Sequence, residues 1–235
     1  MVRRIAMTAS MAAGAFAAPS ASAAPPPTVA PEQELVTLVR SHAVVAAPVD
    51  APRRVGGVSA RRPITRGPTV LPVVGRATSP EGVRFLRVLL PGRPNGREGW
   101  IAQAGTLRST TSWHVIVRTA SRQVRVYRRG RLVRSFSVVV GKRSTPTPPG
   151  RFFVEESIRM LPGSAGAPFA LALSARSTVL QEFKGGPGQI ALHGVSNIGG
   201  TPGTAVSHGC VRLLDRHIRW LAARIATGAP VTITR

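Results

Sequence analysis

The sequence contains a single cysteine, few acidic residues and no long apolar run. Its 235 residues include one cysteine, nine Asp or Glu residues and five histidines. A lone cysteine cannot close a disulfide within the chain, so the sequence predicts no disulfide framework. No segment reaches the ~20 apolar residues that a membrane-spanning helix needs. We therefore do not expect a transmembrane protein.

Lysine and acidic residues are scarce, whereas arginine is abundant. Lys142 and Lys184 are the only lysines among 32 basic residues, and the net charge at pH 7 is +23. The basic residues are spread along the chain and form no compact block with interleaved aromatic residues. This charge permits binding to nucleic acid and also to the anionic polymers of a cell envelope. Abundant arginine and alanine are also typical of a GC-rich genome, and composition does not separate the last two interpretations.

Residues 1–23 have the pattern of a secretory signal peptide. Arg3 and Arg4 supply the positive start, residues 5–16 are mostly apolar, and Ala-Ser-Ala at 21–23 is a small-residue cleavage site. Cleavage there leaves a chain with a net charge of +21. Export argues against nucleic acid as a partner, and it predicts a secreted protein of a cell-wall or periplasm-like compartment.

Composition divides the following residues into a linker and a small β-rich module. Residues 24–34 are rich in proline and alanine, which predicts an extended linker. Residues 35–111 contain short β-prone runs separated by Pro and Gly, a pattern that favours a small β-barrel. The Gly-Trp-Ile run at 99–101 resembles the last strand of bacterial SH3-like modules. We predict an SH3-like accessory module over residues 35–111.

The remaining residues, 112–235, predict a second domain that is mainly β with one late helix. Polar and apolar residues alternate over 122–127, which is the period of a half-buried strand. The proline-rich stretch 145–150 is excluded from a central strand because proline lacks the backbone N–H. Apolar residues at helical spacing after residue 217 predict a helix with Asp215 as its N-cap candidate.

The single cysteine lies close in sequence to two histidines, each of which is followed by a glycine. Cys210 ends the run Ser-His-Gly-Cys at 207–210, and His193 lies seventeen residues upstream. A free thiol with a pKa of ~8.5 is mostly protonated at neutral pH, and a neighbouring imidazole can accept its proton. Gly209 lets the backbone amides turn toward a substrate carbonyl, as acyl transfer requires. From the residues alone, either His193 or His208 can be the base.

Two other interpretations use the same residues. His193, His208 and Cys210 form a potential zinc-ligand set of two imidazoles and one thiolate. This set places two ligands on one tight turn, and no second cluster supports it. A buried structural cysteine would make the nearby histidines and glycines coincidental. The pattern favours a nucleophilic thiol that needs neither a metal nor another cofactor.

These motifs resemble the signature of the L,D-transpeptidase catalytic domain, the YkuD-like family. The resemblance rests on His193-Gly194, the loop 195–206 and the run Ser-His-Gly-Cys-Val-Arg-Leu at 207–213. The proline-rich stretch at 145–152 is similar to the loop that precedes the catalytic region of that family. The resemblance covers residues 112–235 and implies an L,D-transpeptidase-type β-sandwich.

The family resemblance implies a cysteine acyltransferase that cross-links peptidoglycan stem peptides. Cys210 would attack the carbonyl group of the third residue of a tetrapeptide stem, which is a diamino acid. The attack would release the terminal D-alanine. The resulting thioester would pass its acyl group to an amine of a neighbouring stem. His193 would be the base, with the Gly194 carbonyl orienting its imidazole.

The resemblance also suggests roles for the residues around the thiol. Ser207, His208 and Gly209 would shape the turn and the oxyanion hole. Arg212 stands where some family members have Asn. It is a candidate for binding a stem carboxylate, and a structural salt bridge or a surface role is equally compatible with the sequence.

The resemblance leaves open which group accepts the acyl group from the thioester. Water as the acceptor would make the protein an L,D-carboxypeptidase, and an amine of a wall protein would make it an attachment enzyme. A non-catalytic envelope-binding protein, held by the SH3-like module and the positive charge, is the alternative of another class. The presence of both Cys210 and His193 argues against it.

Overall fold

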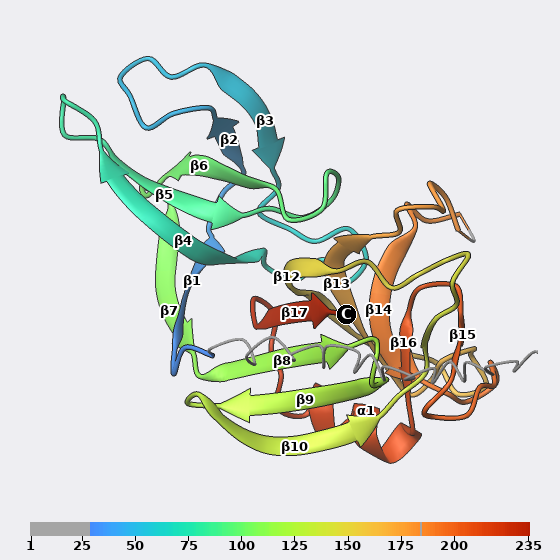
Figure 1. Ribbon diagram of the computed structural model, residues 1–235. Helices are drawn as coiled ribbons and strands as arrows, with labels where there is room; N and C mark the ends of the chain where they lie inside the picture. Colours follow the sequence, from blue (N-terminus) through green and yellow to red (C-terminus); the bar gives the residue numbers. More distant parts are fainter. Residues whose placement is uncertain (1–28, 184) are drawn as a thin grey trace, which may run out of the picture.

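The computed structural model describes residues 29–183 and 185–235 of the chain. The predicted signal peptide, residues 1–23, and the first part of the predicted linker, residues 24–28, lie outside the described residues. Strands dominate the described residues, which contain one α-helix near the end of the chain (Figure 1). The prediction of a mainly β fold with a late helix is confirmed. No helix in the described ranges has the length and apolar character needed to cross a bilayer.

Residues 33–111, which we call the first unit, form a seven-stranded sheet in which hydrogen-bonded neighbours are antiparallel. The strand order is β3-β2-β6-β5-β4-β1-β7. Its buried apolar residues include Val36, Leu71, Leu86 and Ile101. The resemblance of this unit to an SH3-like barrel stays a prediction. The strands are β1 (Gln33–Leu38), β2 (His42–Val45), β3 (Arg54–Val58), β4 (Val70–Thr78), β5 (Arg84–Leu89), β6 (Glu98–Ala102) and β7 (Thr106–Thr111).

Residues 113–235, the second unit, are built on an eight-stranded sheet of order β10-β9-β8-β17-β12-β13-β14-β16. Two of its strand pairs are parallel, β8 with β17 and β14 with β16. A short parallel pair, β11 with β15, lies beside it. The elements are β8 (Trp113–Arg118), β9 (Gln123–Arg128), β10 (Arg131–Ser137), β11 (Val140–Gly141), β12 (Gly150–Arg159), β13 (Phe169–Arg176), β14 (Gln189–Gly194), β15 (Ala205–Ser207), β16 (Val211–Leu213), α1 (Asp215–Ala222) and β17 (Pro230–Thr234).

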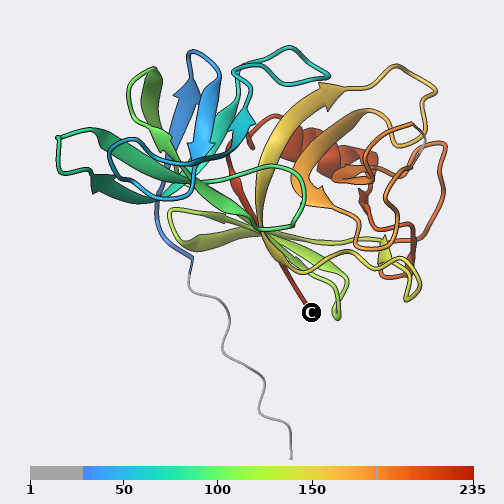
Figure 2. The ribbon, with the colours of Figure 1, turned by 90° about the horizontal axis from the view of Figure 1, so that it is seen from above.

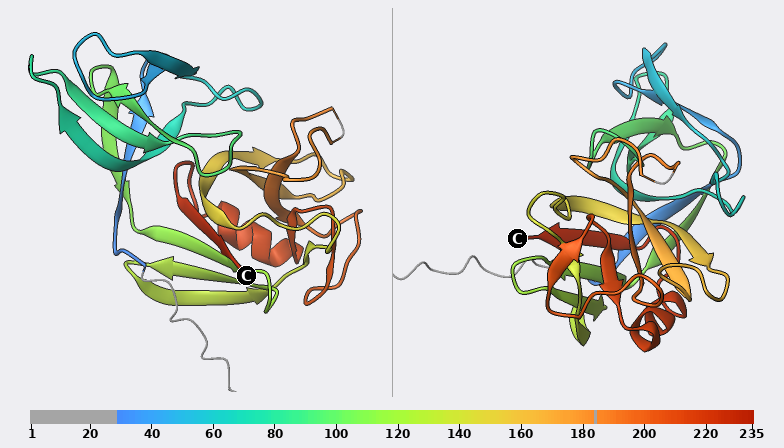
Figure 3. Two further views of the ribbon diagram at one scale, coloured as in Figure 1. Left: turned by 45° about the horizontal axis from the view of Figure 1, so that its top comes forward. Right: turned by 90° about the vertical axis from the view of Figure 1, so that its right-hand side faces the viewer.

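Helix α1 packs against the second sheet beside β13 and β14 (Figure 3). Its buried residues Ile218 and Leu221 join the apolar core of the second unit. The prediction that Asp215 caps the helix is wrong, because the N-cap is Leu214 and makes no side-chain cap. Asp215 is the first helical residue, and its carboxylate instead accepts a hydrogen bond from the Ser196 hydroxyl.

The two units lie side by side (Figure 2) and share an interface that is both apolar and ionic. Phe153 of β12 is fully buried in the core of the first unit. Glu155, on the same strand, is 4% exposed and forms ion pairs with Arg62 of the first unit at 2.6 Å and with Arg176 of the second at 3.1 Å. Removing one partner of such a buried pair leaves an uncompensated charge. The interface is therefore a specific contact between the units.

His114 on β8 makes the stability of the second unit depend on pH. Its Nε2 lies 2.8 Å from the Thr232 hydroxyl oxygen. Burial, and secondly the charge of Arg151, lower the pKa of His114 from 6.5 to about 4. The folded protein thus favours the neutral ring, while the unfolded chain takes up a proton near pH 6.5. The free energy of unfolding is therefore highest above pH 6.5 and falls as the pH drops toward 4.

We expect replacement of His114 by glutamine to reduce the loss of stability at acid pH. The shift from 6.5 to about 4 corresponds to roughly 3 kcal/mol of unfolding free energy. Urea unfolding at pH values between 7 and 4 measures this difference. The free energy of unfolding of the wild type should fall more steeply than that of His114→Gln, by up to roughly 3 kcal/mol. Equal slopes for the two proteins would contradict the expectation.

Candidate active site

His193 lies on β14 and Cys210 directly before β16, two strands that run parallel at the edge of the second sheet (Figure 1). Leu192 pairs with Val211, and His193 pairs with Arg212. Cys210 directly precedes β16, and its thiol donates to the Gln189 carbonyl at 3.9 Å. Side chains two residues apart on a strand share a face. The register therefore places Cys210 and His193 as diagonal neighbours on one face of the sheet.

The His193 imidazole is oriented by the backbone of its neighbour. Its Nδ1 lies 2.8 Å from the Gly194 carbonyl oxygen, and the residue is 9% exposed. A carbonyl only accepts hydrogen bonds, so Nδ1 carries the proton and Nε2 keeps its lone pair. Burial lowers the pKa of His193; the Gly194 hydrogen bond opposes this effect, and the charge of Arg212 adds to it. The ring is therefore neutral at pH 7 with Nε2 as an acceptor.

The Cys210 thiol is protonated in the resting site. Burial raises the pKa of Cys210, while its backbone contact with Ala191 and the charge of Arg212 oppose that rise. The site thus combines a protonated thiol with a neutral imidazole, rather than a preformed thiolate–imidazolium pair. A base must remove the thiol proton before the sulfur can act as a nucleophile.

The turn before the cysteine is fixed by Ser207 and Gly209. The buried Ser207 hydroxyl donates to the Cys210 carbonyl at 2.6 Å and accepts the Gly209 N–H at 3.1 Å. Gly209 has a φ of +122°, and a Cβ at this position would lie 3.0 Å from Cδ1 of Ile190. Only glycine fits this turn without strain. His208, in contrast, is exposed, and its ring stacks on Phe183 with the centroids 5.5 Å apart.

Two buried threonines support this turn from the proline-rich stretch, and sequence reasoning assigned them no role. The Thr145 hydroxyl donates to the Ser207 carbonyl at 3.2 Å, and the Thr147 hydroxyl donates to the Gly209 carbonyl at 2.8 Å. Thr147 also accepts the Gly141 N–H at 2.9 Å. The Thr-Pro-Thr-Pro-Pro pattern in the sequence could have indicated this supporting role, because its prolines keep the backbone between the two hydroxyls rigid.

Arg212 lies beside the site and anchors a loop. It is 7% exposed, and its guanidinium donates to the carbonyls of Gly199 at 3.0 Å and Ile198 at 3.4 Å. It is therefore not a surface residue, and none of the ion pairs within the described ranges includes it. Its fixed positive charge acts on both His193 and Cys210.

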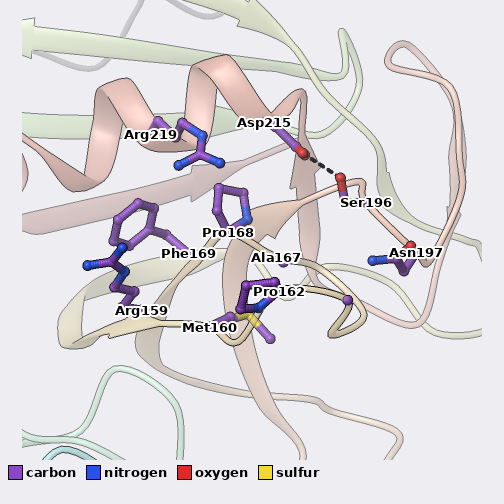
Figure 4. A pocket seen from close by; sticks show the side chains of 11 residues that line it. Arg159, Met160, Pro162, Ala167, Pro168, Phe169, Ser196, Asn197, Asp215 and Arg219 are labelled. Carbon is purple, nitrogen blue, oxygen red and sulfur yellow. Dashed lines mark hydrogen bonds between the residues drawn. The ribbon is translucent and has the colours of Figure 1, made fainter.

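A cavity of about 290 Å³ lies between the loop 160–168 and the start of α1 (Figure 4). The loop 160–168 lines it together with Ser196, Asn197 and the first turns of α1. A Cβ on Gly166 of this loop would lie 2.5 Å from Nδ1 of His193, so the loop packs directly on the imidazole. The same loop thus borders both the cavity and the imidazole.

The candidate zinc set is not assembled. Within the part of the chain that the structure describes, no three His, Cys, Asp or Glu side chains are grouped so that they can hold a metal ion. His193 is buried and bonded to Gly194, whereas His208 is exposed and stacked on Phe183. The two imidazoles therefore have different surroundings.

Comparison with known sequences identifies relatives of the second unit. The family model of the YkuD L,D-transpeptidase catalytic domain matches residues 112–233. The putative L,D-transpeptidase YkuD of Bacillus licheniformis is 31% identical over 125 residues, which cover 53% of this chain and 67% of that protein. The protein of the same name from Bacillus subtilis is 29% identical over 126 residues, which cover 54% and 68%.

Comparison with solved structures finds matches at lower sequence identity. An L,D-transpeptidase from Mycobacterium smegmatis is 15% identical, with a TM-score of 0.42 over 65% of this chain and 90% of that chain. L,D-transpeptidase 3 from Mycobacterium tuberculosis, in complex with a faropenem-derived adduct, is also 15% identical, with a TM-score of 0.44 over 69% and 94%.

Proposed function

Because the chain belongs to the L,D-transpeptidase (YkuD) family and is an L,D-transpeptidase, we propose that it is exported and cross-links peptidoglycan stem peptides through a thioester on Cys210. The observation that carries the proposal is the parallel register of β14 and β16. This register supports a reaction between Cys210 and His193, because it leaves them on one face of the sheet, and the Nδ1 bond to Gly194 leaves Nε2 as an acceptor. Export is supported by the signal-peptide pattern of residues 1–23.

In the first half-reaction Cys210 accepts the acyl group. His193 Nε2 takes the thiol proton while the sulfur attacks the carbonyl carbon of the third residue of a tetrapeptide stem. The C–S bond forms, the C–N bond to D-alanine breaks, and the imidazolium returns the proton to the departing amine. The electron pair on the carbonyl oxygen is held meanwhile as an oxyanion.

Backbone amides of the 207–210 turn stabilise the oxyanion. The Gly209 N–H already donates to the Ser207 hydroxyl, so we assign the Cys210 N–H as the main donor to the oxyanion. Ser207, Gly209 and the exposed His208 then act by holding the turn. The buried Arg212 adds a fixed positive charge that favours both the thiolate and the oxyanion. We propose that the same guanidinium, while it holds the Ile198 and Gly199 carbonyls, attracts a stem carboxylate by its charge.

In the second half-reaction an amine of a neighbouring stem attacks the thioester. The neutral His193 accepts a proton from that amine, the new C–N bond forms, and the C–S bond breaks. The departing thiolate regains its proton from the imidazolium. No metal or other cofactor takes part in these steps. The surplus of positive charge keeps the enzyme near the anionic polymers of the envelope.

Incubating the purified protein with tetrapeptide monomers, followed by mass spectrometry, tests the proposed function. We expect a cross-linked dimer that has lost one D-alanine. A tripeptide product without dimer would indicate an L,D-carboxypeptidase, and unchanged substrate would favour a non-catalytic envelope-binding protein. Adding a protein that carries an accessible amine distinguishes wall-protein attachment, since the acyl group would then transfer to that protein.

A further inference from the structure

The connection between β13 and β14, described over residues 177–183 and 185–188, lies beside the turn that carries Cys210. Phe183 in this segment stacks on His208, two residues before the thiol. The segment leads into Gln189, the first residue of β14, whose carbonyl accepts the thiol hydrogen bond. The position of the segment therefore influences both the turn that carries the cysteine and the surface that a substrate meets there.

An arginine of the first unit binds both ends of this segment. Arg93, in the loop between β5 and β6, donates to the carbonyls of Ser177 and Leu180, each at 3.0 Å. It also donates to the Pro187 carbonyl at 2.9 Å. One planar guanidinium thus joins the start and the end of the segment, a geometry that the single ammonium of lysine reproduces only in part.

A neighbouring contact fixes the β5–β6 loop itself. The Asn95 side chain donates to the Arg176 carbonyl at 2.7 Å and accepts the Arg176 N–H at 2.8 Å. These paired hydrogen bonds lie directly before residue 177. The β5–β6 loop that carries Arg93 is therefore itself hydrogen-bonded to Arg176, the residue before the segment.

The end of the segment is also held through the buried ion pairs between the units. The Gln189 side chain donates to the Glu155 carboxylate at 2.9 Å and to the Leu173 carbonyl at 3.0 Å. Glu155 in turn accepts from Arg62 of the first unit. The first unit is thus linked to the residues beside the thiol in two ways. One link is Arg93, and the other runs from Arg62 through Glu155 to Gln189.

We propose that Arg93 is a positioning residue for the Cys210 site. It holds the described residues of this segment in place, so that Phe183 supports His208 and the segment forms a wall for the stem peptide. This inference rests on the proposed function, because it takes the Cys210 site as the place where the stem peptide binds. It makes the first unit a part of the active site in addition to any accessory role.

Replacing Arg93 with alanine tests this role in kinetics. We expect KM for the tetrapeptide donor to rise about tenfold, because the binding-competent arrangement of the segment becomes a minor population. At saturating substrate, kcat should stay within about twofold of the wild type, since the thiol and imidazole are untouched. Arg93→Lys should restore part of the KM. Arg87→Ala is the matched control, because Arg87 is an exposed arginine that pairs with Glu98 inside the first unit.

Hydrogen exchange measured by mass spectrometry gives a second readout that needs no activity. Amide exchange in residues 178–188 should accelerate in Arg93→Ala and stay unchanged in Arg87→Ala, with the same urea unfolding midpoint for both variants. An unchanged KM together with unchanged exchange would overturn the inference. If the wild type released no D-alanine, the proposed function would fail, and unaccelerated exchange in this segment would then refute the positioning role by itself.

Discussion

Replacing Cys210 with alanine is expected to abolish the release of D-alanine from a tetrapeptide stem. The sulfur forms the bond that holds the acyl group, and the chain has no second cysteine to replace it. Loss of a nucleophile in an acyl-transfer enzyme lowers kcat by roughly 10⁴-fold or more. Product analysis by mass spectrometry measures this loss, and the tripeptide–thioester adduct should disappear with it.

A carbapenem provides a matched test of the same residue without a second substrate. The wild-type protein should gain the mass of one carbapenem molecule, and Cys210→Ala should gain none. Cys210→Ser is the structural control, because the hydroxyl is similar in size but a weaker nucleophile at neutral pH. Undiminished release of D-alanine by Cys210→Ala, or a carbapenem adduct on that variant, would refute Cys210 as the nucleophile.

The candidate site residues could be proposed from the sequence because they lie in short motifs. Cys210 and His193 stand out as a lone thiol with a spaced imidazole, and the glycine before the cysteine indicates a turn that only glycine adopts. Strand alternation predicted the mainly β character in the same way. Each of these features depends on residues close together in the sequence, where period and propensity are informative.

The contacts that support the site were not predictable, because they join residues far apart in the sequence. Thr147 reaches Gly209 across 62 positions, and Arg93 reaches Pro187 across 94. Hydrogen bonds to backbone carbonyls leave no pattern of charge or hydrophobicity in a single sequence. Arg212 shows the same limit. No pattern around it in the sequence indicates that its side chain is buried and donates to the Gly199 carbonyl.

Asp215 shows how a local rule is overridden by tertiary structure. Its position before an apolar helical pattern predicts an N-cap. The loop after β14 instead brings the Ser196 hydroxyl to the carboxylate, and the helix begins one residue earlier than the cap rule requires. The error is therefore confined to one residue and comes from a partner nineteen positions away.

Replacing His193 is expected to slow acylation far more than replacing His208. General-base catalysis contributes roughly 10²–10⁴-fold, and His193 has the geometry for it, with Nδ1 bonded to Gly194 and Nε2 available. His208 is exposed and stacks on Phe183, so its removal disturbs the wall of the site but leaves the base in place. We expect His208→Ala to slow acylation by no more than about tenfold.

The pH dependence of acylation distinguishes a lost base from a disturbed structure. Because burial lowers the pKa of His193, the imidazole stays neutral below pH 6.5, and activity should fall only as the pH drops through this lowered value. The acid limb should therefore lie below pH 6.5 in the wild type and in His208→Ala. In His193→Gln, which keeps a polar side chain of similar length, the limb should vanish together with most of the rate.

Single-turnover acylation by a carbapenem, followed by mass spectrometry across this pH range, measures both effects on one step. It avoids product release and the choice of acceptor, so a change in rate reports on the thiol and its base. The raised pKa of the Cys210 thiol strengthens the comparison, because the protonated thiol depends on a base at neutral pH. A greater loss in His208→Ala than in His193→Gln, or an acid limb that survives without His193, would assign the base to another group.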